Sequence, residues 1–354
     1  MELAEAPDGL AAAAAALYRF AGDPAHGYSE PLPAGLKAHL TGKTPSFAEM
    51  TLRGEAASAS FEDGSSVAVL TFDEDVVTAV NDGDGWRVVG ADLERFGVEP
   101  WFGPAHRTIL VIGSDARPGQ AQLRFRADSL HIVTAVPARR TGALVGIPRD
   151  TWVDDPLGGQ DKIAHLMAST GPDVELQGVR DFTGVPIEGY VVTGFKGFTE
   201  LIDTLGGLLV DVPFRIVTNG FEGQPSIPAG TQRLAGIRAL LFARMRKTVP
   251  GGDFTRSRHQ GIIMLAALAE AQRRGLLAVP GLLETLLRHA WTDLDAEDLI
   301  NVALSAFYIG VESAENVVLP GSTARASTGA SIVNLDPEAW YILTDLHDGV
   351  IDES

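Results

Sequence analysis

The stretch from Arg244 to Gln260 carries the densest set of side chains able to do chemistry in this sequence. Its seventeen residues include four arginines, one lysine and one histidine but a single carboxylate, Asp253, in a chain of formal net charge -18. Guanidinium groups bind phosphate oxygens in pairs, so the stretch is typical of a site for a multiply charged anion such as a diphosphate. A solvated basic face that pairs with acids elsewhere would give the same composition, and spacing alone does not separate the two.

The elements around this stretch must bring its cations together. Residues 239–246, if they form a strand, project Arg244 and Arg246 from the same face because side chains alternate along a strand. A Pro-Gly-Gly segment then interrupts the chain. We expect a strand end and a helix N-terminus to lie side by side here, since free N–H groups at a helix start also attract anions.

The expected helix begins near Asp253, which could act as its N-terminal cap. Arg256 and Gln260 are four residues apart and therefore share one helical face. Apolar residues at 262, 263, 265, 266 and 268 give the following turns a side that packs on the core.

Other polar residues stand where predicted strands begin or end. Ligands bind at such strand ends in open α/β sheets. These residues and the basic stretch together give the set Asp115, Arg117, Arg126, Asp128, Arg149, Lys162, Arg244, Arg246, Asp253, Arg256 and Gln260. Carboxylates supply hard oxygen ligands for Mg²⁺, and the arginines could surround an anion that the metal bridges. This inventory is typical of phosphoryl transfer.

Composition limits the class of protein. With 354 residues, 45% hydrophobic content and a mean hydropathy of +0.09, the chain can bury a large core. The acidic excess, with a pI of about 4.8, argues against nucleic acid as a partner. The absence of cysteine excludes disulfides, zinc-thiolate sites and thiol nucleophiles.

The sequence contains no stretch of about 20 apolar residues, the length that spans a bilayer. Its start is acidic, with Glu2, Glu5 and Asp8, whereas a signal peptide begins with basic residues. We therefore expect the chain as written to be soluble and not exported. Either the protein is cytoplasmic, or the chain begins after an anchor that has been removed.

Residues 1–98 are predicted to form a small α+β domain. An Ala-rich helix at 10–20 precedes four alternating segments at 51–61, 66–72, 76–80 and 86–89, which indicate an antiparallel meander with a helix on one face. Residues 81–85, Asn-Asp-Gly-Asp-Gly, favour a hairpin turn over a calcium loop because the terminal glutamate of such loops is missing. No set of side chains in this domain suggests chemistry.

After a Pro- and Trp-containing segment at 97–106, interpreted as a linker, residues 104–354 are predicted to form an α/β domain. Its mixed central sheet is expected to be sandwiched by helices. Strands are expected at 108–113, 130–136, 144–147, 189–192 and 208–212. Helices are expected near 162–169, 173–182, 195–205, 253–268, 281–289 and 296–308.

The sequence resembles the LytR-CpsA-Psr family of bacterial cell-wall glycopolymer transferases. The matching segments occur in the family's order between about residues 104 and 349, which is about 70% of the chain. They are Ile109–Arg117, Arg126–Ser129, Gly146–Thr151, Asp161–Ile163, Gly189–Val192, Asp203–Gly207, Ile227–Gly230, Arg244–Arg246, Gly252–Arg256 and Leu319–Gly321. Each segment alone is a weak signal, and the ordered set is a strong one.

The resemblance implies a Mg²⁺-dependent phosphotransferase that moves a glycan phosphate from a polyprenyl-diphosphate carrier to peptidoglycan, with a hydrophobic pocket for the prenyl tail. It implies that Asp115 and Asp128 hold the metal and that Arg126 orients or activates the acceptor hydroxyl. The diphosphate would be bound by Arg149, Lys162, Arg244, Arg246, Arg256 and Gln260. Asp253 would order the arginines or cap the helix and would not contact the metal. It also implies an extracytoplasmic protein that meets the membrane surface through its lipid substrate.

The chain departs from the family pattern at two places. Ala164 and His165 stand where the family usually has asparagine after Lys-Ile, and His259 replaces an arginine for which Arg258 could substitute. Two other functions remain open at this point. One is a non-catalytic polyprenyl-phosphate binding or scaffold protein, and the other is a simple pyrophosphatase in which water replaces the acceptor.

Overall fold

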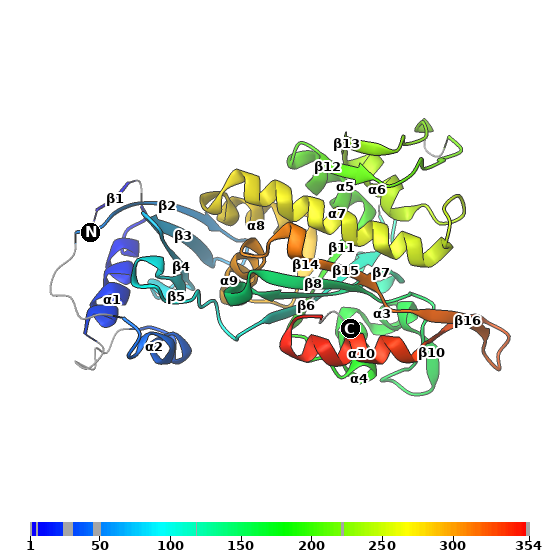
Figure 1. The fold of residues 1–354 in the computed structure, drawn as a ribbon, viewed down its shortest axis with the longest axis horizontal. Helices are drawn as coiled ribbons and strands as arrows, with labels where there is room; N and C mark the ends of the chain where they lie inside the picture. Colours follow the sequence, from blue (N-terminus) through cyan, green and yellow to red (C-terminus); the bar gives the residue numbers. More distant parts are fainter. Residues whose placement is uncertain are drawn as a thin grey trace.

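The computed structural model describes residues 2–4, 6–23, 31–44, 51–117, 119–220 and 223–351. In these residues the chain forms a five-stranded sheet near the N-terminus and a six-stranded sheet in the rest of the molecule, with helices on the faces of both (Figure 1). Three two-stranded sheets lie outside them.

The N-terminal sheet has the strand order β1-β2-β3-β4-β5. Its elements are β1 (Glu2–Ala4), α1 (Leu10–Gly22), α2 (Ala34–Leu40), β2 (Arg53–Ser60), β3 (Ser66–Phe72), β4 (Asp75–Asn81) and β5 (Trp86–Asp92). Strands β2 to β5 form the predicted antiparallel meander, and β1 adds to β2 in parallel. The Asn81 side chain accepts hydrogen bonds from the N–H groups of Gly83 and Gly85. The hairpin interpretation of residues 81–85 is confirmed.

The larger sheet has the order β14-β11-β6-β7-β8-β15 and mixes parallel with antiparallel pairs. Its strands are β6 (Arg107–Ser114), β7 (Ala127–Val136), β8 (Thr141–Gly146), β11 (Gly189–Gly194), β14 (Ala290–Thr292) and β15 (Glu315–Val318). Short two-stranded sheets are made by β9 (Trp152–Asp154) with β10 (Gln160–Lys162), β12 (Leu208–Val212) with β13 (Gly230–Leu234), and β16 (Gly321–Arg325) with β17 (Ser331–Leu335).

Helices cover both faces of this sheet, as Figure 1 shows. Below it in that view lie α3 (Leu166–Thr170), α4 (Pro172–Thr183) and α10 (Pro337–Asp345); above it lie α5 (Phe195–Thr204), α6 (Gly236–Arg244) and the long α7 (Gly252–Arg274). The remaining helices are α8 (Val279–Leu287) and α9 (Ala296–Phe307). The predicted mixed sheet between helical layers is confirmed.

Strand β6 shows why the layers form. Its residues alternate between two cores: Leu110 and Ile112 pack with the layer of α4 and α10, whereas Ile109 belongs to the core on the other face. A continuous apolar run is what a strand buried on both faces requires. The strand expected at 108–113 is confirmed, and its burial on both faces follows from that run.

One predicted strand is wrong. Residues 236–244 form helix α6, in which the run from Ala239 to Ala243 is buried. A short apolar run does not distinguish a buried strand from a buried helix by its pattern, and the alanine, leucine and arginine of this segment favour a helix. The chain is extended again at Met245, the C-terminal cap of α6.

Helices α8 and α9 pack against the second face of the N-terminal sheet. Val67, Val69 and Val80 of that sheet share a core with Leu283 of α8 and Ile300 of α9. Because α1 and α2 cover the opposite face, the N-terminal sheet is enclosed between helices from both ends of the chain (Figure 1).

Polar contacts join the same elements. The Asn301 side chain of α9 accepts a hydrogen bond from Thr78 at 3.1 Å and donates one to the Val89 carbonyl at 3.1 Å. The Tyr308 hydroxyl donates to Asp92 at 2.6 Å. In the segment interpreted as a linker, Trp101 exchanges two backbone hydrogen bonds with Ala91 and thereby extends these contacts.

The carboxyl group of Glu175 is buried in the layer below the larger sheet. It accepts a hydrogen bond from the Met167 N–H at 2.7 Å, and burial raises its pKa from the ordinary 4.5 to about 8. Between these values the folded protein holds a proton that the unfolded chain has released. Stability is therefore expected to fall as the pH rises from about 4.5 towards about 8.

We predict that Glu175→Gln flattens this part of the stability profile, because the amide oxygen still accepts the hydrogen bond while the titration is removed. The denaturation midpoint, followed by circular dichroism between pH 5 and about 8, measures the effect. Glu284→Gln, a change at a carboxylate paired with Arg288 on the surface of α8, is the matched control.

Buried His131 makes an opposite contribution to the pH dependence of stability. This contribution is the same in wild type and in Glu175→Gln, so it cancels when the two profiles are compared. Burial lowers the pKa of this histidine to about 4, so it destabilises the fold as the pH falls below its ordinary 6.5. Identical pH profiles for wild type and Glu175→Gln would contradict the prediction.

Candidate active site

A cavity of about 730 Å³ lies between the larger sheet and helices α5 to α8. Apolar side chains from these helices and from two strands form much of its wall, including Val111, Val191, Phe198, Leu201, Ile202, Leu240, Ile263, Met264, Ala267 and Leu286. The polar residues of the wall come from strand ends and the loops beside them, from the end of α6 and from the N-terminal part of α7. They are Asp115, Arg117, Gln120, Arg126, Asp128, Arg149, Arg244, Arg246, Arg256, Gln260, Ser114, Ser129 and Thr193. The cavity thus combines a charged region with an apolar one.

Asp115 and Asp128 come from neighbouring strands. The pairing of β6 with β7 shifts register near Gly113, and the Asp115 N–H then donates to the Arg126 carbonyl at 3.0 Å. The Arg126 guanidinium donates to one oxygen of Asp115 at 3.1 and 2.9 Å. The other oxygen, Oδ1, is buried and has no hydrogen-bond partner in the described part of the chain. A buried carboxylate oxygen of this kind is suited to a metal ion or to a substrate hydroxyl.

Asp128 and Asp253 hold three arginines together. Arg149 donates to Asp128, while Arg256 lies 3.0 Å from Asp253 and 3.9 Å from Asp128. Arg246 and Arg149 approach Asp253 at 3.7 and 3.8 Å. Each of these carboxylates is therefore shared by more than one cation.

The environment acts differently on the pKa values of half-buried Arg149 and buried Arg256. Burial opposes the charge of Arg149, but Asp128 and Asp253 outweigh it, so its pKa is raised. Burial lowers the pKa of Arg256, since Asp253 offsets only part of the effect and Arg149 adds repulsion. Arginine stays protonated nonetheless, so an anion placed beside Arg256 would relieve an unfavourable burial of charge.

Arg244 and Arg246 reach the cavity although they do not lie on a strand. Arg244 ends α6 and packs over the ring of Phe195 at 4.0 Å, and the extended Met245 turns Arg246 towards Asp253. Sequence analysis did not select Phe195. The signal was its position, since it directly follows β11 at the sheet edge where β6 also ends.

Helix α7 approaches the sheet closely at its N-terminus. A Cβ atom on Gly146 of β8 would lie 2.2 Å from the Ser257 hydroxyl, so only glycine permits this packing. The close approach puts Arg256 beside Asp128. One turn further on, the Gln260 amide donates to the Ala243 carbonyl at 3.3 Å, which ties α7 to the end of α6.

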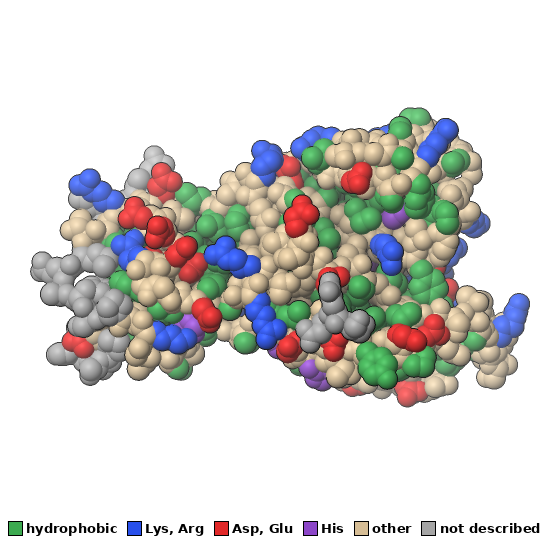
Figure 2. Space-filling view, viewed as in Figure 1, with side chains coloured by type: hydrophobic (Ala, Val, Ile, Leu, Met, Phe, Trp, Pro, Cys, Tyr) green, Lys and Arg blue, Asp and Glu red, His purple; other side chains and the backbone are tan. Residues whose placement is uncertain are grey.

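The lining has the opposite charge to the whole chain. Six arginines and two aspartates line the cavity, an excess of four positive charges, and the adjacent Asp253 reduces it to three. Figure 2 shows acidic side chains gathered over the N-terminal sheet on one face of the molecule, in keeping with the net charge of -18. A polyanion would balance the excess inside the cavity.

Three predicted positions differ from expectation. Lys162 is not among the described residues that line the cavity, because it lies on β10 and its amino group donates to Asp150 at 2.8 Å. Of the two roles expected of Asp253, it does not cap α7, whose N-cap is Gly251, but it does pair with the arginines. Arg258, considered as a substitute at His259, is exposed and lines a different hollow.

Among the described residues no group of three or more histidines, cysteines, aspartates or glutamates could hold a metal ion. Asp115 and Asp128 are the two carboxylates among the described residues that line the cavity. Mg²⁺ commonly binds one or two carboxylates together with substrate phosphates and water, so a pair is compatible with a metal that arrives with a diphosphate.

Comparison with known proteins shows the family of the chain. The model of the LytR_cpsA_psr family matches residues 104–342. The chain belongs to this family. The family predicted from the ordered sequence segments is therefore confirmed. The chain is an enzyme of the transferase class found in this family.

Similar proteins include the polyisoprenyl-teichoic acid–peptidoglycan teichoic acid transferase TagU of Bacillus mycoides. It is 30% identical over 224 residues, which cover 63% of this chain and 71% of that protein. The enzyme of the same name from Bacillus licheniformis is 36% identical over 154 residues, or 43% and 48% of the two chains.

Solved structures share the fold of the larger domain. The crystal structure of B. subtilis TagU is 25% identical, has a TM-score of 0.53, and the match covers 70% of this chain and 98% of that one. The structure of TagT bound to LI-WTA is 24% identical with a TM-score of 0.59, and the match covers 70% and 92%. Within the part of the chain described here, no helix combines the length and apolarity needed to cross a bilayer.

Variants at Phe195 and Phe198 test the charged and the apolar region of the cavity separately. We predict that Phe195→Leu weakens the binding of inorganic pyrophosphate about 5-fold, because Arg244 loses the aromatic face beneath it. Phe198→Leu, which changes the apolar lining and keeps the Phe195 ring under Arg244, should leave pyrophosphate binding unchanged and weaken only a prenyl diphosphate. Isothermal titration calorimetry with both ligands tests this, and an equal loss of pyrophosphate binding in both variants would contradict it.

Proposed function

We propose that this protein transfers a glycan, through its phosphate, from a polyprenyl-diphosphate carrier to a hydroxyl group of peptidoglycan. The observation that carries the proposal is one cavity in which a cluster of arginines adjoins an apolar wall. Such a cavity suits a ligand with a diphosphate head and a hydrocarbon tail. The names of the Bacillus relatives, which specify polyisoprenyl-linked teichoic acid and peptidoglycan, support the same substrates.

In this reaction an acceptor hydroxyl oxygen attacks the phosphorus that carries the glycan. The bond from that phosphorus to the bridging oxygen of the diphosphate breaks. The products are a phosphodiester between glycan and peptidoglycan, polyprenyl phosphate and one proton. Negative charge grows on the departing phosphate, so the protein's main task is to position the reactants and to neutralise this charge.

The arginines suit that task. Arg149 and Arg256, already fixed by Asp128 and Asp253, would bind diphosphate oxygens, and Arg244 and Arg246 would close on them from the end of α6. Gln260 would add a hydrogen bond from α7. Arg126, held against Asp115, would orient the acceptor hydroxyl.

We further propose that Asp115 and Asp128 hold Mg²⁺. The buried and unpaired Oδ1 of Asp115 supports this assignment. When bound, the ion would supply positive charge beside the diphosphate during transfer. Since the donor is a lipid, we also propose that the protein works at a membrane surface, on the extracytoplasmic side where peptidoglycan lies.

We expect transfer from a short-chain polyprenyl-diphosphate disaccharide to soluble peptidoglycan fragments to require Mg²⁺. Asp128→Ala and Arg244→Ala should each lower the rate at least about 100-fold, the size of effect seen when one group that stabilises developing charge is removed. Mass spectrometry of the fragments measures transfer. Arg139→Ala, at an exposed arginine paired with Asp348, is the control for loss of an arginine outside the cavity.

Two outcomes would favour the alternatives. Tight binding of polyprenyl phosphate with no transfer to any acceptor would indicate a binding or scaffold protein. Release of phosphorylated glycan at the same rate with and without peptidoglycan fragments would indicate a pyrophosphatase. Transfer at the wild-type rate in both cavity variants would contradict the proposed site itself.

A further inference from the structure

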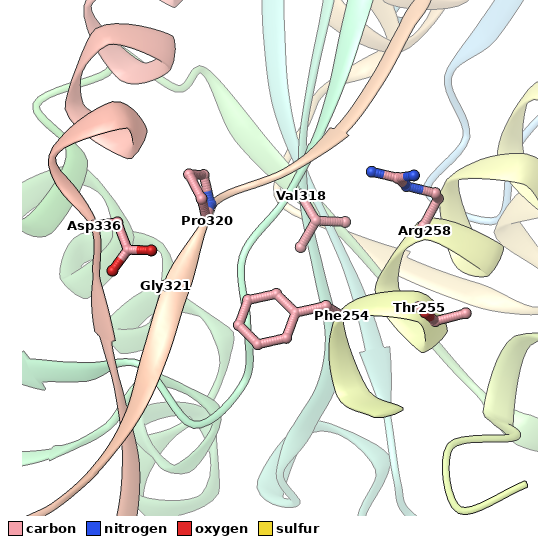
Figure 3. A pocket seen from close by; sticks show the side chains of 7 residues that line it. All are labelled: Phe254, Thr255, Arg258, Val318, Pro320, Gly321 and Asp336. Carbon is pink, nitrogen blue, oxygen red and sulfur yellow. The ribbon is translucent and has the colours of Figure 1, made fainter. Parts of the chain in front are cut away.

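A second hollow, of about 390 Å³, lies beside the N-terminal turns of α7. Its walls come from α7, from the segment that joins β15 to β16, and from the residue that precedes α10 (Figure 3). The lining residues are Phe254, Thr255, Arg258, Val318, Pro320, Gly321 and Asp336. None of these residues has a role in the site described above.

The hollow is a near neighbour of the arginine cluster. Arg256 and Gln260 of α7 line the large cavity, whereas Phe254 and Arg258 of the same turns line the hollow, so α7 separates the two. The elements that form the hollow are also bonded to the segment that carries Arg149. The N–H of Leu319, between the lining residues Val318 and Pro320, donates to the Gly146 carbonyl at 2.9 Å, and the Val333 N–H of β17 donates to the Asp150 carbonyl at 2.8 Å.

The chemistry of the hollow differs from that of the cavity. Its charged residues are one cation, Arg258, and one anion, Asp336, so it carries no positive excess to bind a second phosphate. In the described part of the chain neither side chain forms an ion pair, and Asp336 caps α10 without a side-chain hydrogen bond. Both are therefore available to a ligand.

Phe254 gives the hollow an apolar surface. Its ring extends from α7 into the space between Val318 and Gly321, with Asp336 on the far side (Figure 3). A sugar ring has an apolar C–H face that packs on an aromatic ring, and hydroxyl groups at its edge that need both donors and acceptors. An aromatic ring flanked by a guanidinium and a carboxylate supplies these contacts, and the volume lies at the lower end of the range for small-molecule sites.

We infer that this hollow is a subsite for a sugar ring of one of the two glycan substrates. The inference rests on the proposed function, in which a glycan-bearing donor and a peptidoglycan acceptor must both reach the arginine cluster. A sugar held by Phe254, Arg258 and Asp336 lies on the other side of α7 from the cavity that Arg256 lines. It fixes the direction from which a long polymer approaches the reacting phosphate.

Direct binding tests the subsite without any turnover. Saturation-transfer NMR is recorded with soluble peptidoglycan disaccharide-peptide fragments and, separately, with the free glycan of the donor. Wild type should saturate the sugar protons of at least one probe, and Phe254→Ala and Asp336→Asn should weaken that binding about 5-fold or more. Tyr341→Ala, at an exposed aromatic residue of α10 that does not line the hollow, is the matched control and should bind as wild type.

The Arg244→Ala variant distinguishes failure of the subsite from failure of the proposed function. It should lose transfer yet bind the same probe as wild type does. If wild type binds the probe but transfers nothing, the proposed function fails and the subsite stands. If neither probe binds wild type, or if Phe254→Ala binds both as wild type does, the subsite is refuted whether or not transfer occurs.

Kinetics then identify which substrate supplies the sugar. In Phe254→Ala and Asp336→Asn the KM for the acceptor should rise about 5-fold if the sugar belongs to peptidoglycan, and the KM for the donor should rise if it belongs to the carried glycan. The kcat should stay within about 2-fold of wild type, since neither residue contacts the reacting atoms. Unchanged KM values for both substrates would refute the inference, and thermal unfolding confirms that each variant is folded.

Discussion

The repulsion among arginines at one edge of the sheet is the constraint on which the site depends. Asp128 and Asp253 each bind more than one guanidinium, and in this way two carboxylates hold Arg149, Arg246 and Arg256 within a few ångströms of one another. Removing a buried partner from such a network leaves cations uncompensated, which is costly. The acids therefore have a structural task besides any role toward a metal, and a ligand with several negative charges completes the balance.

Helix α7 does much to organise that edge. Its long body packs with α6 and β12 in the core above the sheet, while Gly146 lets its first turns approach β8 closely. Arg256 is thus carried to the sheet edge by a helix that is packed along its length. The same turns present different residues to the cavity and to the hollow beside it, so one helix sets the geometry of both.

The apolar wall of the cavity is connected to the N-terminal sheet through α8. Leu286 lines the cavity, and Leu283 of the same helix lies in the core shared with β3 and β4. The first hundred residues, in which no chemistry was found, therefore support a wall of the site from behind. Burial of this shared apolar surface fixes α8 in place.

Sequence alone determined the features that depend on local pattern or on ordered motifs. The two-sided burial of β6 follows from its apolar run, the meander follows from alternation and turn residues, and the family follows from its segments in order. All eight charged residues that line the cavity were also selected in advance. Those beside the strands were selected because polar groups at strand ends meet at a sheet edge, and Arg244, Arg246 and Arg256 because they belong to the basic stretch.

The features that depend on competing partners or on packing between elements could be known only from the tertiary structure. Lys162 matched a family segment, but its amino group is held by Asp150; the segment before Arg244 is a helix, although its short apolar run also allowed a strand. The ring of Phe195 under Arg244 and the packing of α8 on the N-terminal sheet join residues far apart along the chain. Such contacts depend on the positions of whole elements in space, and residue spacing along the chain does not encode those positions.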